Sequence, residues 1–245
     1  MLSVIAGIIG TYIVTRRMVF VAGGITHASF GGIGIAYYLG LSPIGGALMF
    51  AILTALGIEL LGKQGKIRED SAIAILWSLG MAIGVIFMFL TPGYTSNLMG
   101  FMFGDVLSVS QTDIITVGIM ATITTILTII FYRPILYTAF TPDYATITGW
   151  NTKIVGTVTA ILVAIALVLA IKAVGIILVL SLFTIPQAMA NIFVKNMGKM
   201  MIVSTLVAII GSLVGLVISF TLDLPVGATI TALLSASLLI IKLIR

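Results

Sequence analysis

Long apolar runs alternate with short polar breaks along the whole chain. The clearest breaks are the arginine pair at 16–17, the segment GKQGKIRED at 62–70 and the polar interval 133–153. A transmembrane helix requires about 20 predominantly apolar residues. The expected spans lie at residues 2–15, 18–39, 43–61, 71–90, 113–132, 154–171, 173–194, 200–220 and 224–243. The pattern therefore predicts an all-α polytopic membrane protein with about nine transmembrane helices, in a range of about eight to ten.

Two segments fit this pattern less well. Residues 2–15 are short for a full span. Residues 98–112 are too short and too broken for one, and we expect a re-entrant or interfacial segment there, which needs protein around its backbone.

The composition excludes an ordinary soluble domain. The chain of 245 residues is 60% hydrophobic and 8% charged, with a mean hydropathy of +1.31, whereas soluble domains carry about 25% charged residues. The 26 glycines favour close approach of helices in lipid, and we expect the pairs Gly80/Gly84, Gly100/Gly104 and Gly211/Gly215 to serve packing. The absence of cysteine excludes disulfides and thiolate metal sites.

The basic residues predict the orientation. With the N-terminus outside and the C-terminus in the cytoplasm, 11 of the 12 lysines and arginines fall on the cytoplasmic side, and only Lys172 falls outside. Cytoplasmic loops of membrane proteins carry this excess. The net charge of +5 is therefore explained without a nucleic-acid partner.

His27 is the only histidine, and it lies in the small-residue segment GGITHASFGGIG at 23–34. Either it is a metal ligand or proton carrier facing a pathway, or it is a neutral histidine bonded to a neighbouring helix. Within a membrane span an ionisable residue is a functional candidate by default. One imidazole does not make a metal site. Thr26 and Ser29 are weak oxygen donors. Glu59 is the one plausible acid within a span, either deep in it or facing the cytoplasmic interface.

Three further motifs bear on the chemistry of the chain. The segment GIELLGK at 57–63 lacks the Ser or Thr that a P-loop needs, because Gln64 follows the lysine, so we expect no ATPase chemistry. Pro186 kinks a span, either near a transport pathway or simply as a packing feature. The segment FTPDYATITG at 140–149, with Asp143, Ala145 and Gly149, predicts a short helix that docks a soluble partner.

Six segments together carry a resemblance. They are RRM at 16–18 before the His27 segment, REDSAI at 68–73, FGDVL at 103–107, FTPDYATITG at 140–149, the Val174–Gly175 to Pro186 stretch, and LDLPVG at 222–227. In this order, over nearly the whole chain, they resemble the permease subunits of ABC importers for zinc, manganese and related metal ions.

The resemblance implies a single permease domain over residues 1–245 with an ATPase-docking loop at about 134–152. It implies a multi-pass protein of the bacterial cytoplasmic membrane, surrounded by lipid. The partners would be a second permease copy in a homodimer, a cytoplasmic ATP-binding subunit and an extracytoplasmic metal-binding protein. The cargo would be a divalent ion of zinc, manganese or iron, with no covalently bound cofactor and no enzymatic activity in the permease itself.

The resemblance also assigns residues. His27 would bind the metal in transit, while Asp143, Ala145 and Gly149 would dock the ATPase. The family usually has an Asp four residues before the histidine, and here that position is Gly23. Thr141 stands where the family often has Asp.

Two other classes are alternatives. A secondary transporter would need buried acids or an internal repeat for ion coupling. An intramembrane enzyme would need a nucleophile with its base, or paired carboxylates. The chain has few buried acids, and His27 has no acid on its own helix.

Overall fold

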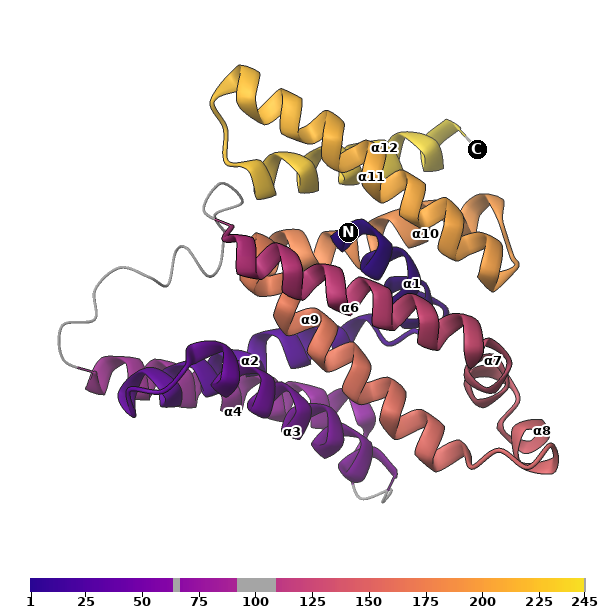
Figure 1. The fold of residues 1–245 in the computed structure, drawn as a ribbon, viewed down its shortest axis with the longest axis horizontal. Coiled ribbons are helices and arrows are strands. Elements are labelled where there is room, and N and C mark those ends of the chain that lie inside the picture. Colours follow the sequence, from indigo (N-terminus) through magenta and orange to yellow (C-terminus); the bar gives the residue numbers. More distant parts are fainter. Residues whose placement is uncertain (64–66, 92–108, 245) are drawn as a thin grey trace. The chain divides into compact units, whose positions relative to one another are not determined.

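The computed structural model describes residues 1–63, 67–91 and 109–244, and the regular elements among them are all helices (Figure 1). The segment 98–112, expected to be re-entrant, lies mostly outside the described residues. The helices are α1 (Leu2–Thr15), α2 (Val19–Tyr38), α3 (Pro43–Lys63), α4 (Glu69–Leu90), α6 (Gln111–Ile130), α7 (Tyr132–Phe140), α8 (Pro142–Ile147), α9 (Thr152–Leu182), α10 (Ile185–Phe193), α11 (Met197–Leu222) and α12 (Val226–Ile244).

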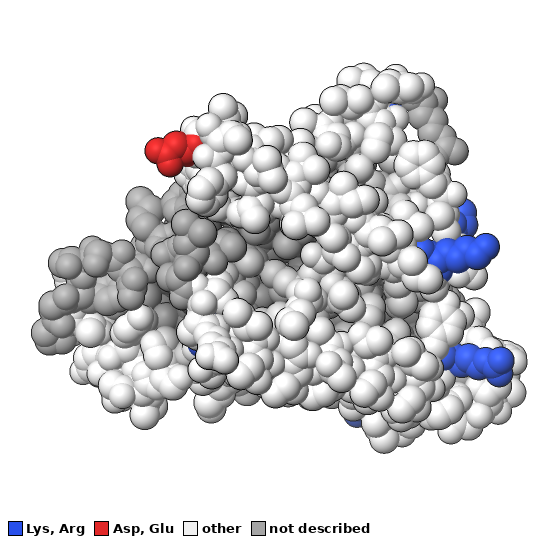
Figure 2. Space-filling view, turned by 45° about the horizontal axis from the view of Figure 1, so that its top comes forward, with Lys and Arg blue, Asp and Glu red and all other residues white. Residues whose placement is uncertain are grey.

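Seven stretches of the described chain are long and apolar enough to cross a membrane. One of them, Thr152–Phe193, has 42 residues and joins α9 to α10, and α1 is a shorter apolar helix. Large apolar side chains lie exposed on these helices, with Phe89 90% and Phe220 77% exposed. On the face in Figure 2, most of the described surface is neither acidic nor basic. A surface of this kind is solvated by lipid.

The described residues form two compact units. Unit 1 comprises residues 1–18, 109–126 and 170–244, and unit 2 comprises residues 19–91 and 127–169. The helices α6 and α9 therefore contribute residues to both units.

In unit 2, α2 packs between α3 and α4 through glycine backbones (Figure 1). A Cβ atom added at Gly31 would lie 2.7 Å from the Gly80 carbonyl oxygen, and one at Gly34 would lie 2.5 Å from that of Gly84. Gly32 is in equally close contact with Gly46 of α3. The predicted packing role of Gly80 and Gly84 is confirmed, since only residues without a side chain allow this approach.

In unit 1, α1 packs mainly against α11, and α11 packs against α12. Thr11 of α1 and Ser204 of α11 share a buried hydrogen bond of 3.1 Å. A Cβ added at Gly215 would lie 2.7 Å from Ile230 Cγ1, and Gly211 contacts Leu234 of α12 in the same way. The packing role of Gly211 and Gly215 is therefore also confirmed.

The stretch from α9 to α10 departs from the expected boundary. We expected two spans separated at Lys172, but α9 continues through that residue and is interrupted at Gly175, which has φ 80° and ψ 165°. Glycine adopts this conformation without the clash that a Cβ would cause. A second break, at Phe183–Thr184, precedes α10. The position of glycine, rather than of the charged residue, sets the interruption.

Candidate metal-transit site

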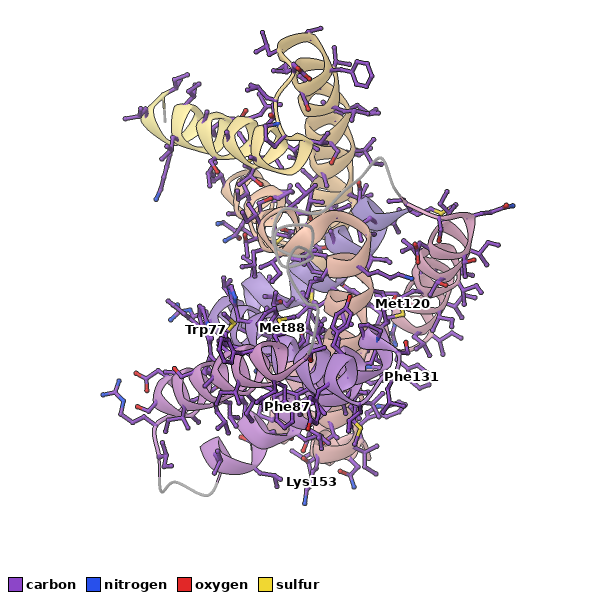
Figure 3. The ribbon with its side chains drawn as sticks, turned by 90° about the vertical axis from the view of Figure 1, so that its left-hand side faces the viewer. Trp77, Phe87, Met88, Met120, Phe131 and Lys153 are labelled. Atoms are coloured by element: carbon purple, nitrogen blue, oxygen red, sulfur yellow. The ribbon has the colours of Figure 1, made fainter. Side chains whose placement is uncertain are left out.

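His27 lies half-buried in the middle of α2 and stacks on Trp77 of α4. The two ring centroids are 4.4 Å apart, and the ring planes differ by 5°. Trp77 projects from α4 (Figure 3). The helices α2 and α4 both belong to unit 2. Sequence reasoning missed Trp77, because 50 residues separate it from His27 and no local pattern links the two.

Gly23, one helical turn before His27, differs from the other glycines of α2. A Cβ added there would meet only Trp77 Cζ3, at an ordinary contact distance of 4.0 Å. At the neighbouring Gly24, a Cβ would lie 2.7 Å from Ile73 Cγ2. The position that the resemblance gives to an acid therefore has room for a Cβ atom, and helix packing does not require glycine at it.

The other candidate metal ligands are the oxygen-bearing side chains of Thr26, Ser29 and Glu59. Thr26 is fully buried, and its Oγ1 has no hydrogen-bond partner among the described residues. Ser29 Oγ donates to the Thr26 carbonyl oxygen at 2.6 Å, which leaves its hydroxyl proton engaged. Glu59 of α3 accepts a hydrogen bond of 3.1 Å from Thr157 of α9.

The described residues contain no group of three or more His, Cys, Asp or Glu side chains placed to hold a metal ion. His27 is therefore the one strong transition-metal donor of α2. An ion that binds it must complete its coordination with water or with other groups.

Pro186 lies in the first turn of α10, directly after the break at Phe183–Thr184. A proline at this position sacrifices no helical hydrogen bond. The adjacent Gln187 is fully buried. Its Nε2 donates hydrogen bonds to Ala6 O at 2.7 Å and to Leu182 O at 3.1 Å, and so bridges the end of α9 and helix α1. The kink is thus present, and its proximity to a transport pathway stays a prediction.

The polar interval after α6 contains the expected short helix, α8, and a second one, α7. Asp143 lies in the first turn of α8, and Ala145 is fully buried. Gly149 has φ +85°, and its N–H donates to Thr146 O at 3.0 Å while the Trp150 N–H donates to Ala145 O at 2.9 Å. These two bonds form a Schellman motif. The Ala-x-x-x-Gly spacing therefore has a local cause: Ala145 accepts the longer bond and Gly149 supplies the left-handed residue.

A cavity of about 580 Å³ lies beside these two short helices, between them and the end of α6. Its lining is rich in aromatic residues, including Tyr132, Tyr137, Tyr144 and Trp150. Tyr137 of α7 and Tyr144 of α8 meet edge to face, with ring centroids 4.9 Å apart. Aromatic contacts thus fix α8 against α7, and the expected docking residues Asp143 and Gly149 stay exposed.

Comparison with known proteins places the chain in a family. Residues 1–245 match ABC-3, the ABC 3 transport family. The chain is 37% identical over 238 residues to a probable metal transport system membrane protein of Chlamydia pneumoniae, covering 95% of this chain and 81% of that protein. It is 32% identical over 236 residues to the manganese transport system membrane protein MntC of Halalkalibacterium halodurans, covering 96% and 80%.

A solved structure shows the same fold. PsaBC from Streptococcus pneumoniae in complex with Fab superposes with a TM-score of 0.86 at 27% identity, covering 98% of this chain and 86% of that one. The chain belongs to the ABC 3 transport family. The resemblance to permeases of metal-ion ABC importers is thereby confirmed, and the chain is a multi-pass protein of the bacterial cytoplasmic membrane.

Proposed function

We propose that this chain is the permease subunit of an ABC importer for divalent transition-metal ions, and that His27 binds the ion in transit. The family match over the whole chain supports the class. The single observation that carries the site is the placement of His27 on α2, stacked on Trp77 and beside the open position Gly23. Imidazole is a ligand for zinc, iron and other first-row ions, and manganese is named for several relatives.

A permease of an ABC importer works with an ATP-binding subunit and a substrate-binding protein. In our proposal two copies of this chain form a homodimer that alternates between outward and inward states. The ATP-binding subunits supply the energy, and the permease performs no covalent chemistry. A ligand shifts such an equilibrium only by binding the two states with different affinity.

For the membrane topology, we propose nine crossings with the N-terminus outside and the C-terminus in the cytoplasm. The 42-residue stretch Thr152–Phe193 then crosses twice, since about 20 residues suffice for one span. The interruptions at Gly175 and at Phe183–Thr184 support this division. Together with α1 as a short span, the seven candidate stretches give nine crossings.

ATPase docking belongs in this proposal to the loop that contains α7 and α8. Asp143 and Gly149 are exposed on α8 and its cap, whereas Ala145 is buried beneath them. Ala145 therefore packs inside the protein and holds the docking helix in place, while Asp143 and Gly149 contact the ATP-binding subunit.

Reconstitution tests the proposal directly. Proteoliposomes containing the permease, its ATP-binding subunit and its binding protein should take up radioactive Mn²⁺ or Zn²⁺ only when ATP is supplied. His27→Ala should abolish uptake while leaving the yield of purified protein unchanged. Uptake by the permease alone, driven by an ion gradient, would contradict the ABC mechanism. Normal uptake by His27→Ala would reject the site and leave the class intact.

A further inference from the structure

Trp77 stacks on His27 and also faces position 23 of the candidate transit site. Its indole stacks on His27, with ring centroids 4.4 Å apart and the planes 5° from parallel. The same indole is the one group within 4 Å of a Cβ added at Gly23. The indole thus faces α2 at residues i and i+4, which lie on one stripe of the helix surface.

We infer that Trp77 is the positioning residue of the transit site: its indole fixes the plane of the His27 ring and so sets how strongly the site holds a metal ion. This inference rests on the proposed function of His27.

The backbones of α2 and α4 approach closely on both sides of the His27–Trp77 pair. On either side of the pair, Gly24 is in contact with Ile73, and Gly31 lies against the Gly80 carbonyl. These contacts set the distance between the helices at van der Waals limits. The helix pair therefore holds the two residues close enough for their rings to stack.

A parallel stack has a definite consequence for metal binding. Both imidazole nitrogens lie in the ring plane at its edge, so an indole against the ring face blocks neither of them. It does restrict the rotation of the imidazole, so the directions in which the nitrogens can bind are fixed before the ion arrives. A ligand held in its binding geometry loses less entropy on binding.

Glycine at position 23 leaves the space beside the Trp77 indole free of a second side chain from α2. A side chain there would project toward the indole from the same stripe of α2. Among the described residues, the Trp77 indole is the only group within 4 Å of that added Cβ. The Trp77 indole therefore faces both His27 and the open position Gly23.

The first measurement is the metal affinity of the purified permease without its partner subunits, because the metal-binding protein would itself bind the added ion. Isothermal titration with Mn²⁺ should give a dissociation constant for Trp77→Phe, which keeps a stacking ring, within about threefold of the unmodified protein. Trp77→Leu should raise that constant by about tenfold. Phe87→Leu is the matched control. Phe87 of α4 meets Tyr38 of α2 edge-on at 5.3 Å, between the same two helices and away from His27.

The second measurement uses indole fluorescence, since the chain contains only two tryptophans. In a Trp150→Phe background of the same purified permease, Trp77 is the only tryptophan, and excitation at the red edge of indole absorption excludes the tyrosines. Open-shell ions such as Mn²⁺ and Co²⁺ quench indole emission at short range, so either ion should quench Trp77 with a half-saturation equal to the calorimetric constant. His27→Gln should abolish this quenching by added metal.

The outcomes separate the two claims. Equal Mn²⁺ affinity in Trp77→Leu and the unmodified protein would overturn the positioning role, whatever His27 does. The same holds if Phe87→Leu weakens binding as much as Trp77→Leu, because the effect would then be general helix packing. Quenching that survives His27→Gln would reject His27 as the ligand, and with it the proposed transit site.

Discussion

Lys172 of α9 forms an ion pair with Asp113 in the first turn of α6. Both residues belong to unit 1, and Ser110 Oγ donates a further hydrogen bond of 2.7 Å to Asp113 Oδ2. Lys172 is the single basic residue that the charge pattern assigns to the outer side. Its charge is balanced by an acid from a distant part of the chain, so it does not contradict the orientation that the other basic residues favour.

We expect Asp113→Asn to destabilise the protein by about 1.5–3 kcal/mol, the usual range for hydrogen bonds to charged groups. The lysine would then lie beside a neutral amide, with its charge uncompensated. Thermal unfolding in detergent measures the change, and exchanging the two residues should restore part of the loss. The control is Asp70→Asn, because the Arg68–Asp70 pair is 84% and 64% exposed and should contribute little. Equal effects at both acids would contradict the structural role of the Lys172–Asp113 pair.

Gly23→Asp should be tolerated and should tighten metal binding. The added Cβ meets only Trp77 Cζ3, at 4.0 Å, and the carboxylate would lie one turn from His27 on the same face. An additional anionic ligand should lower the Mn²⁺ dissociation constant by about tenfold, or about 1.4 kcal/mol. Gly34→Ala is the control for helix packing, since its Cβ would lie 2.5 Å from Gly84 O. We expect that variant to lose folded protein, and poor folding of Gly23→Asp would show that position 23 lacks the space described here.

Gly149→Arg should uncouple ATP hydrolysis from uptake. A Cβ at this residue meets nothing within 4 Å, but the φ of +85° costs an ordinary residue about 1–2 kcal/mol. The cap of α8 should therefore distort locally while the spans stay folded. Hydrolysis and uptake measured on the same proteoliposomes test this, with Gly149→Asn as the variant that tolerates the left-handed conformation. Labelling of a cysteine placed at 149 from the extracellular side would show that both the topology and the docking role are wrong.

Gly175→Ala should impair folding, because its φ of 80° and ψ of 165° suit glycine alone. Gly156 of the same helix provides a matched control. A Cβ there has open space and an ordinary backbone, so Gly156→Ala should be neutral or stabilise by up to about 1 kcal/mol. The yield of monodisperse protein compares the two. If Gly175→Ala matches Gly156→Ala, the interruption of α9 does not depend on glycine.

The sequence predicts most helices of this fold because proline or charged residues mark where the helices begin and end. Pro43 opens α3 as expected, and the acidic start of α4 at Glu69 lies two residues before the expected position 71. Apolar runs do not reveal where a long helix is interrupted. The break in α9 depends on the backbone of Gly175, one of 26 glycines, and Lys172 was the more conspicuous residue.

The site divides in the same way. His27 is visible in the sequence as the only histidine, within a small-residue helix. Trp77 and the open space at Gly23 depend on the way α2 packs against α4, and no local pattern encodes that packing. The Ala145–Gly149 spacing was recognised by resemblance, but its physical cause, the Schellman cap, requires the hydrogen bonds.

The glycine contacts of α2 also have a mechanical meaning. Where backbone touches backbone, no side chain can change rotamer to absorb a displacement, so α2, α3 and α4 respond to force as one stiff body. We expect spin labels on α3 and α4 to keep a constant separation throughout a transport cycle. Ion binding at His27 would then bias the position of all three helices together, by as much as its affinity differs between the outward and inward states.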